Sequence, residues 1–478
     1  MAKRGHYTPR VTAYADVAQL DVPPLSAILA GLAPDVRQVY LVGPRPGDGT
    51  AKGMYAWLGE PAVAEEWSTD GSHLDPDTPT LRLTHRETER RVEVRRAAQW
   101  FGEGLYTVDD ARGALALLQA RIQDGWPGAA VLSTPAVTGR ALFDLSTPAG
   151  TSYEPLDDDT RALIARTSGQ GRIELCGVAD TAPGFYYLDG RFMYAALCKE
   201  LPGALTSHDT GDELVPYQRA RYRVRFTVPA DWAHVGLFMV PVEGTRDRWH
   251  YPAAPGSTWE TWADGVEVEL ARSHGWDVAI VERLIFSTAR PLDTWARKLI
   301  DLRGQIGDAG DTITDLARAG LRNILLHTIG GFARRERTAT RLVSTADLAR
   351  VEGVLESAPS QVRPGVWLVE EREELPARLA VYQHPEWAAA IWARARSRLL
   401  WSRVQCAGAL AVPRADVLGF QVDALYLAHD PGWPDKGTPG HFRCKGSVTR
   451  EIATPRTWVQ MEALKDRATG EGEVSHGA

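Results

Sequence analysis

The sequence predicts an α+β protein, and three features of the chain indicate this class. Two mainly apolar segments, residues 185–197 and 417–428, have the composition of buried strands. Residues 215–290 are rich in strand patterns, and residues 222–228 alternate strictly between apolar and polar side chains. Residues 384–400 have a proline near the first turn followed by several alanines, which favours a helix that packs closely on a sheet.

Length and composition place the chain among ordinary globular proteins. Its 478 residues are enough for two or three domains with a substantial core. Charged residues make up 24% of the chain, and no apolar run is long enough to span a membrane. The first residues, Met1–Gly5, lead into polar sequence without an apolar stretch, so we expect no secretory signal and a cytoplasmic location.

The cysteines and the charge distribution narrow the possible functions. The four cysteines are scattered without metal-binding spacing, so we expect reduced thiols and no zinc site. A net charge of −7 does not indicate nucleic-acid binding, although a groove that follows phosphates needs only local cations. A cluster of cationic side chains can also be a plain solvated surface. Aromatic rings interleaved with the cations instead favour a surface that binds a nucleic-acid strand. The chain has two cationic clusters. The first consists of Arg318, Arg322, Arg334, Arg335, Arg337 and Arg341. The second, which has the interleaved rings, consists of Arg443, Lys445, Arg450 and Arg456, with His441, Phe442 and Trp458.

Two carboxylates stand out because each is attached to an apolar strand. Asp189 ends the strand expected at the start of the first segment, and Gly190, a turn former, follows it and leads into a short predicted helix. Asp423 is the only charged residue of the second segment between Asp416 and Asp430. Taken alone, Asp189 is typical of a turn or cap residue. Two buried carboxylates on two strands instead suit a pair of divalent cations, which can clamp both oxygens of an in-line phosphoryl displacement.

The residues around Asp189 resemble the first catalytic motif of family B DNA polymerases, D-x-x-S-L-Y-P. Asp189 falls on the metal-binding aspartate and Met193 on the leucine. Tyr194 falls on the tyrosine that screens the sugar 2′ position, while Phe192 and Ala195 replace the serine and the proline. The resemblance implies that Met193 and Tyr194 bind the incoming nucleotide.

The residues around Asp423 are similar to a second motif of the same family, Y-x-D-T-D-S. Asp423 falls on its second aspartate, whereas Gln421 and Ala424 replace the first aspartate and the serine. In the family, the two aspartates that this chain retains hold the metals. The resemblance therefore implies a two-metal site of Asp189 and Asp423, with Mg²⁺ as cofactor and Mn²⁺ as an alternative.

Two further segments match the family in the same order along the chain. Gly169, Gly171 and Arg172 let the backbone approach a phosphate, although a plain turn is the alternative. They resemble the Y-x-G-G element that contacts the template. Arg456 and Trp458 fall on a K-x-Y element, typical of protein-primed members, that holds the primer strand. With Lys445, these residues are the predicted DNA contacts.

A helix predicted over residues 312–329 carries a fifth similarity. Arg318 and Arg322 share one face of this helix. Neighbouring carboxylates are the default partners of these two arginines, and the triphosphate of a nucleotide is the alternative. The helix resembles the fingers motif K-x-x-x-N-S-x-Y-G, with Arg322 on the lysine. Leu326 and Ile329 replace the asparagine and the tyrosine that flank the nascent base pair.

Residues 1–150 form a separate predicted unit. Strands are expected at residues 36–43, 80–84 and 91–95, with a capped helix over residues 107–122. In the family this region is a proofreading exonuclease, which needs a D-x-E strand. The region has no D-x-E, and its nearest candidate, Asp16, lacks the glutamate. A degenerate or unrelated domain without exonuclease activity is therefore expected.

The resemblance implies a palm-fingers-thumb polymerase with an antiparallel palm sheet and a reduced, exonuclease-like N-terminal α/β domain. The function it implies is DNA-directed DNA synthesis from dNTPs on a primer-template, in replication of a phage or mobile element, with a terminal priming protein as a further partner. A polymerase-like DNA-binding protein without synthesis and an unrelated interaction protein are the alternatives. The predicted parts are an N-terminal domain (1–150), palm (151–300), fingers (301–345), second half of the palm (346–435), thumb or primer-strand region (436–468) and disordered tail (469–478).

Overall fold

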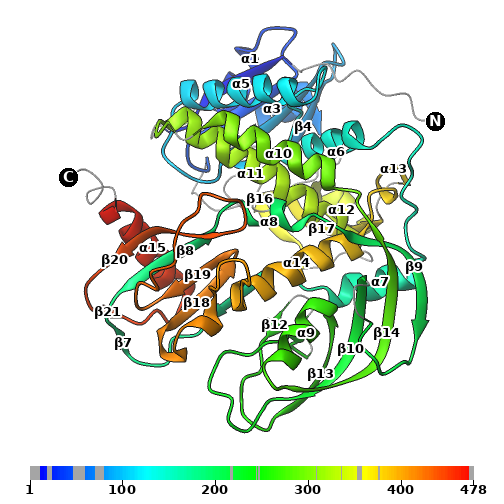
Figure 1. Ribbon diagram of the computed structural model, residues 1–478. Coiled ribbons are helices and arrows are strands. Elements are labelled where there is room, and N and C mark those ends of the chain that lie inside the picture. Colours follow the sequence, from blue (N-terminus) through cyan, green and yellow to red (C-terminus); the bar gives the residue numbers. More distant parts are fainter. Residues whose placement is uncertain are drawn as a thin grey trace. The chain divides into compact units, whose positions relative to one another are not determined.

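A computed structural model of the chain forms two compact units (Figure 1). The first unit contains Met1–Pro148 and Asp301–Ala380, and the second contains Ala149–Ile300 and Val381–Ala478. No helix in the described parts of the chain is both long and apolar enough to cross a bilayer. The structure describes residues 11–18, 24–46, 57, 60–69, 80–215, 219–243, 245, 248–307, 309–334, 336–351, 358–374 and 377–472.

The first unit contains a five-stranded sheet of mixed direction. Three neighbouring strands are parallel and two more are antiparallel at one edge. The strands expected at residues 36–43, 80–84 and 91–95 are confirmed. Asp16 ends the first strand, and its carboxylate accepts the Ala18 amide at 2.8 Å. In sheet order, the strands are β1 (Thr12–Asp16), β2 (Gln38–Val42), β5 (Arg91–Arg96), β4 (Thr80–His85) and β3 (Trp67–Thr69).

Helices complete the core of the first unit. The predicted cap of α5 is confirmed, because Thr107 and Asp110 form a capping box at its start. The long helix α11 lies so close to α6 that a Cβ on Gly139 would be 1.8 Å from the Thr328 hydroxyl. The helix predicted over residues 312–329 is confirmed, but it continues through the two glycines to Phe332. The helices are α1 (Leu25–Ala30), α3 (Pro61–Glu66), α4 (Ala98–Phe101), α5 (Val108–Gly125), α6 (Pro135–Ser146) and α11 (Thr312–Phe332).

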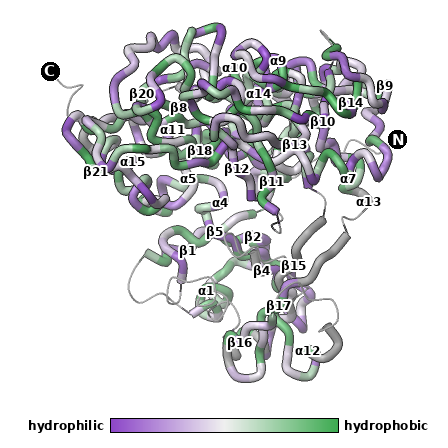
Figure 2. The backbone as a smooth tube through the Cα atoms, turned by 90° about the horizontal axis from the view of Figure 1, so that it is seen from below, coloured by the Kyte–Doolittle hydropathy of each residue, from purple (hydrophilic) through white to green (hydrophobic). Residues whose placement is uncertain are grey.

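A three-stranded antiparallel sheet, β15–β17–β16, also belongs to the first unit. Its residues Leu342 and Leu368 pack against the core of the five-stranded sheet, beside which it lies in Figure 2. Residues 346–380, expected in the second half of the palm, belong to the same compact unit as residues 1–148. The elements are β15 (Glu336–Ser344), α12 (Thr345–Val351), β16 (Ser360–Arg363), β17 (Val366–Glu374) and α13 (Ala377–Ala380).

The second unit is built on a five-stranded antiparallel sheet. The segment 417–428, expected as one strand, is a hairpin of two strands with Val422 and Asp423 at its turn. The sheet order is β20 (Phe442–Val448), β8 (Phe185–Gly190), β19 (Ala424–Leu427), β18 (Val417–Val422) and β6 (Arg172–Leu175). Short elements beside it are α8 (Met193–Leu197), η2 (Ala409–Ala411), η3 (Arg414–Asp416), and the pair β7 (Thr181–Ala182) and β21 (Ile452–Ala453).

The last helix, α15 (Trp458–Gly472), packs on this sheet through Met461 and Leu464. It includes residues 469–472, so the disordered tail does not begin at residue 469 as expected. Residues 473–478 of that expected tail lie outside the described residues. The four cysteines are free thiols, and burial raises the pKa of Cys198 to about 12.

A second antiparallel sheet accounts for the strand patterns of residues 215–290. Residues 235–240, expected as a buried strand, are buried but mostly irregular, and Gly236 among them lies against the Tyr251 and Pro252 carbonyls. The sheet order is β13 (Thr258–Asp264), β10 (Arg219–Thr227), β14 (Asp277–Ala289) and β9 (Leu201–Asp209). Nearby elements are α7 (Asp158–Thr167), α9 (Gly265–Ser273), and the paired strands β11 (Val240–Pro241) and β12 (Trp249–His250). The helix α10 (Asp293–Ile306) follows and crosses the boundary between the units.

The predicted helix at residues 384–400 is confirmed as α14 (Pro385–Leu400), and most of its residues are buried. Ala389 packs with Leu284 and Phe286 of the second sheet, where small side chains allow close contact. The Trp387 indole donates a 3.0 Å hydrogen bond to the Pro202 carbonyl, which fixes the helix against β9. The helix is therefore the buried scaffold of the second unit.

Asp264, the N-cap of α9, gives the fold a testable pH dependence. Burial raises its pKa from 3.8 to about 6, although Arg394 and Arg221 oppose the shift. Between about pH 4 and 6 the folded protein therefore holds a proton that the unfolded chain has lost, so this group's contribution to stability falls as the pH rises. In Asp264→Asn, which keeps a good cap but cannot ionise, the free energy of unfolding should lack the part of the pH dependence that comes from this carboxyl group. Urea titrations across this range measure the difference between the two proteins; a difference that does not change with pH would contradict the assignment.

Candidate active site

Asp189 lies near the end of β8, and Asp423 lies in the hairpin turn between β18 and β19, the strand that pairs with β8. Asp189, on β8, pairs across the ladder with Ala424, the residue that follows Asp423. The Gly190 amide donates a 2.9 Å hydrogen bond to the Asp423 carbonyl, which fixes this register. The two residues are 7% and 4% exposed, respectively. The structure thus brings together two acidic residues that are far apart in the sequence and buries both.

The backbone is strained beside each of these aspartates. Val422 has a φ of 63°, a value that β-branched residues rarely adopt, and it immediately precedes Asp423 in the hairpin turn. Phe192 has a φ of 46° just before α8. Such strained residues persist only where the surrounding structure holds them, and they concentrate at functional sites. The expected turn after Asp189 is confirmed, and Gly190 permits it because a Cβ there would lie 2.2 Å from the Met193 methyl carbon.

Tyr194 is held between the hairpin and the glycine segment that precedes β6. It is 2% exposed. A Cβ on Gly171 would be 2.8 Å from the Tyr194 hydroxyl oxygen and 3.0 Å from the Val422 Cα. Gly171 is therefore needed for the close approach of these three residues. Gly169 is also constrained, since it has a φ of 59° and lies against Met239. Both glycines predicted to approach DNA thus have packing roles, Gly171 against Tyr194 and Gly169 against Met239.

Two arginines of α14 fix the backbone segments on either side of Tyr194. Arg396 pairs with Glu267 at 2.8 Å and donates to the Ser168 and Gln170 carbonyls at 3.2 and 2.8 Å. Arg394 donates to the Leu197 carbonyl at 2.9 Å, at the end of α8. Sequence reasoning found the helix but missed these two residues. Their only signal was the presence of arginines in an otherwise apolar helix.

Lys445 contacts Asp189 directly. Its ammonium group lies 3.2 Å from Asp189 Oδ2 and 3.5 Å from the Tyr187 hydroxyl oxygen. It also lies over the Tyr187 ring, 5.2 Å from the centroid. A positive group against a buried carboxylate offsets part of the cost of removing that charge from water.

A polar network joins Gln421, at the position of the family's first aspartate, to α15. Its side-chain oxygen accepts from the Tyr426 hydroxyl at 2.6 Å and from Lys465 at 3.0 Å. Its side-chain nitrogen donates to Glu462 at 3.0 Å. Burial raises the pKa of Tyr426, and the charges of Glu462, Asp189 and Asp423 add to this increase. Sequence reasoning missed Glu462 and Lys465, because nothing in the pattern of α15 indicates its contact with Gln421.

The remaining predicted site residues have diverse surroundings. Arg172 is fully buried: its guanidinium donates to Glu174 and, at 2.8 Å, to the Gly236 carbonyl, and it lies over the Tyr251 ring. These contacts give it a structural role in place of the predicted DNA contact. Met193 is also fully buried, at the start of α8.

The predicted primer-strand residues lie at the edge of the second unit. Arg456 donates to the Gly177 and Ala179 carbonyls at 2.6 and 2.8 Å, so part of its donor capacity is used within the fold. Trp458 begins α15 and is partly buried. Arg318 and Arg322 lie on α11, in the first unit, and both are partly exposed.

The donor set at Asp189 and Asp423 fits divalent cations such as Mg²⁺. Carboxylate oxygens are the ligands these hard ions prefer, and Mg²⁺ commonly keeps one or two protein carboxylates while water and phosphate complete its shell. Within the described residues no group of three or more His, Cys, Asp or Glu side chains gathers as a metal site. A cation here would therefore depend on the substrate for some of its ligands.

Comparison with solved structures shows that the chain has the fold of a DNA polymerase. Phi29 DNA polymerase in an orthorhombic crystal form matches with a TM-score of 0.57 and 12% identity, over 89% of this chain and 78% of that one. Phi29 DNA polymerase complexed with primer-template DNA and incoming nucleotide substrates matches with a TM-score of 0.58 and 13% identity, over 89% and 79%. No protein-family model and no curated protein matches the sequence. At the level of fold, the resemblance inferred from the degenerate motifs is confirmed.

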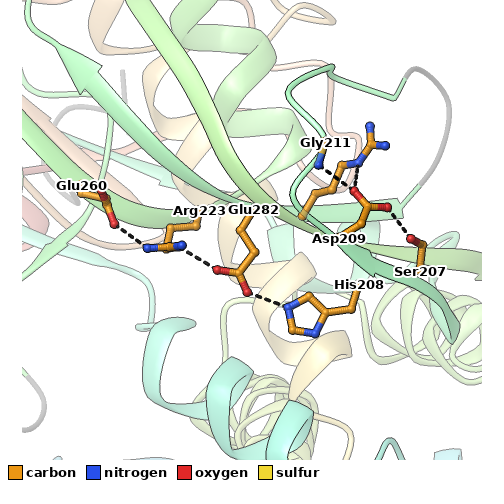
Figure 3. Close-up of polar contacts among 8 residues, drawn as sticks. Ser207, His208, Asp209, Gly211, Arg223, Glu260 and Glu282 are labelled. Carbon is orange, nitrogen blue, oxygen red and sulfur yellow. Dashed lines mark hydrogen bonds and ion pairs between the residues drawn. The ribbon is translucent and has the colours of Figure 1, made fainter.

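Two arginines of the second unit, the buried Arg396 and the more exposed Arg223, are both paired with glutamate and provide a matched test of the α14 contacts. Arg396→Met leaves the buried Glu267 without its partner, so we expect a loss of about 3–5 kcal/mol in the free energy of unfolding. Arg223→Met breaks ion pairs with Glu260 and Glu282 on the exposed face of the second sheet (Figure 3), and we expect a loss of about 1 kcal/mol or less. Chemical denaturation measures both variants. Similar losses would show that Arg396 does not hold the site.

Proposed function

We propose that the chain is a DNA-directed DNA polymerase of the family B type, which adds dNTPs to a primer 3′-hydroxyl by two-metal nucleotidyl transfer. One observation carries the proposal: strand pairing brings Asp189, near the end of β8, beside the hairpin turn that contains Asp423, and both residues are buried. The fold shared with phi29 DNA polymerase supports it. The replication of a phage or mobile element, with a terminal priming protein, is the context that the sequence resemblance implies.

In this proposal the parts of the chain take the following roles. The five-stranded sheet is the palm, its second half begins near residue 381, and α15 belongs to the primer-strand region. The residues 301–345 are the fingers, and residues 1–148 are a reduced exonuclease-like domain. Arg318 and Arg322 stay predicted triphosphate contacts. Gly169, Gly171, Lys445, Arg456 and Trp458 stay predicted DNA contacts.

The chemistry requires two carboxylates and a dry, fixed geometry. The primer oxygen forms a bond to the α-phosphorus, the bond to pyrophosphate breaks, and the hydroxyl proton leaves to solvent. Bound Mg²⁺ or Mn²⁺ would activate that hydroxyl and stabilise the leaving pyrophosphate. Asp189 and Asp423 would hold the cations, and their burial strengthens every electrostatic interaction with them. Tyr194, fixed by Gly171 and α8, would lie against the sugar of the nucleotide and exclude a 2′-hydroxyl.

A polymerase-like protein that binds DNA without synthesis is the second candidate. Two observations favour it: Gln421 replaces an acidic residue of the family motif, and the Lys445 ammonium contacts Asp189. Both reduce the negative charge available to cations. The two candidates differ in whether the bound primer is extended.

Primer extension by the wild type and by variants that neutralise either aspartate distinguishes the two candidate functions. Asp189→Asn and Asp423→Asn should each lower the rate of primer extension by at least about 10²-fold, because an amide cannot replace a carboxylate opposite a divalent cation. Asp430→Asn, at an exposed aspartate just beyond β19, should extend at the wild-type rate. Primer extension with Mg²⁺ and with Mn²⁺ measures the rates. If the wild type binds primer-template but extends it with neither metal, the second candidate is correct.

Tyr194 provides a test of sugar selection. Tyr194→Val removes the ring that would exclude a 2′-hydroxyl, so we expect ribonucleotide use relative to deoxyribonucleotide use to rise by about 10- to 100-fold. Single-nucleotide incorporation with matched dNTP and rNTP gives the ratio of kcat/KM. Tyr194→Phe, which keeps the ring, is the control and should retain selectivity. A Val variant with unchanged discrimination would exclude Tyr194 from sugar selection.

A further inference from the structure

Lys445 contacts a carboxylate oxygen of Asp189, the residue predicted to bind metal. The ammonium nitrogen is 3.2 Å from Asp189 Oδ2, within ion-pair distance. An ammonium and a divalent cation repel each other, so they cannot both occupy this place beside one carboxylate. The Lys445 side chain is 31% exposed, so its flexible stem has solvent into which it can move. The ammonium group therefore contacts one defined carboxylate oxygen, and its side chain has solvent into which it can withdraw.

The local fold directs Lys445 to this place. The pairing of β20 with β8 is regular up to Cys444, opposite Leu188, and resumes at Gly446, opposite Tyr187. Lys445 is the extra residue of this bulge, and bulges beside active sites redirect side chains. Gly446 is needed there, since a Cβ would lie 2.4 Å from the Ala468 carbonyl of α15. The position of the lysine is thus built into the packing of β20 against α15.

A second lysine on the same ring has a different partner. The ammonium groups of Lys445 and Lys465 lie 5.2 and 5.7 Å from the centroid of the Tyr187 ring. Lys465 is held by Glu462 at 2.7 Å and by Gln421 at 3.0 Å, so its charge is balanced within α15 and the hairpin. Lys445 instead balances the charge of Asp189. Two lysines near one ring therefore differ in whether they compete for the predicted metal ligand.

We propose that Lys445 is a tethered counter-ion that a divalent cation must displace from Asp189, and that the displaced ammonium then binds a phosphate of the incoming nucleotide. This inference rests on the proposed two-metal site. Without nucleotide, Lys445 stabilises the buried carboxylate and weakens metal binding. With nucleotide, the same charge has a phosphate partner and no longer opposes the metal. The site would then fill with metal mainly when substrate is present.

Mn²⁺ binding to the full chain tests the proposal without any catalytic step. The loss of the electron paramagnetic resonance signal of free Mn²⁺ measures affinity in the absence of DNA and nucleotide. Lys445→Met should bind Mn²⁺ about five-fold more tightly than the wild type, the size expected for one partly exposed ion pair. Lys445→Arg, which keeps the charge, should stay within about two-fold of the wild type. With a saturating non-hydrolysable dNTP analogue, the advantage of the Met variant should disappear.

Two further variants make the result decisive. Lys465→Met removes an equal charge from the same ring without a contact to Asp189, and it should change affinity by less than about two-fold. The proposal is overturned if Lys445→Met binds Mn²⁺ as the wild type does, or if Lys465→Met tightens binding equally. Asp189→Asn should abolish the strong Mn²⁺ site. If it does so while Lys445→Met has no effect, the metal site stands and only the role of Lys445 fails. If Asp189→Asn leaves Mn²⁺ binding unchanged, the proposed function fails with it.

Discussion

The pairing of β8 with the hairpin β18–β19 is the constraint on which the rest of the second unit depends. It places Asp189 opposite Ala424 and ties Gly190 to the Asp423 carbonyl. A shift of this register by one residue would turn one strand's side chains to the other face of the sheet and move Asp189 away from the hairpin turn. The packing of α15 on one part of the sheet and the contacts of α14 with the segments around Tyr194 hold this arrangement in place.

Keeping two carboxylates buried is costly, and the surrounding residues offset part of that cost. Lys445 provides a positive charge at Asp189. The backbone is strained at Val422 and Phe192, a conformation that tertiary contacts must hold. Tyr426, Glu462 and Lys465 satisfy the hydrogen-bonding groups of the Gln421 side chain. The region around Asp189 and Asp423 therefore combines a strained backbone with a partly compensated negative charge.

The sequence was sufficient to predict the features that depend on local pattern. It predicted α14, three strands of the five-stranded sheet in the first unit, and the two aspartates, which strand pairing brings together. It could not predict the hairpin turn, because a turn that requires positive φ normally has glycine or asparagine rather than Val422. The burial of Arg172 and the contacts of Lys445 and Glu462 also escaped prediction, since they depend on segments distant along the chain.

The most direct test of the central claim is to locate the cations. Crystals of the protein with primer-template, a non-hydrolysable dNTP analogue and Mn²⁺ would reveal each metal by its anomalous scattering. The account predicts two peaks beside the paired strands, with oxygens of both Asp189 and Asp423 about 2.0–2.3 Å from metal. Anomalous density that involves neither carboxylate, or only one of them, in a complex with correctly bound primer and nucleotide would contradict it.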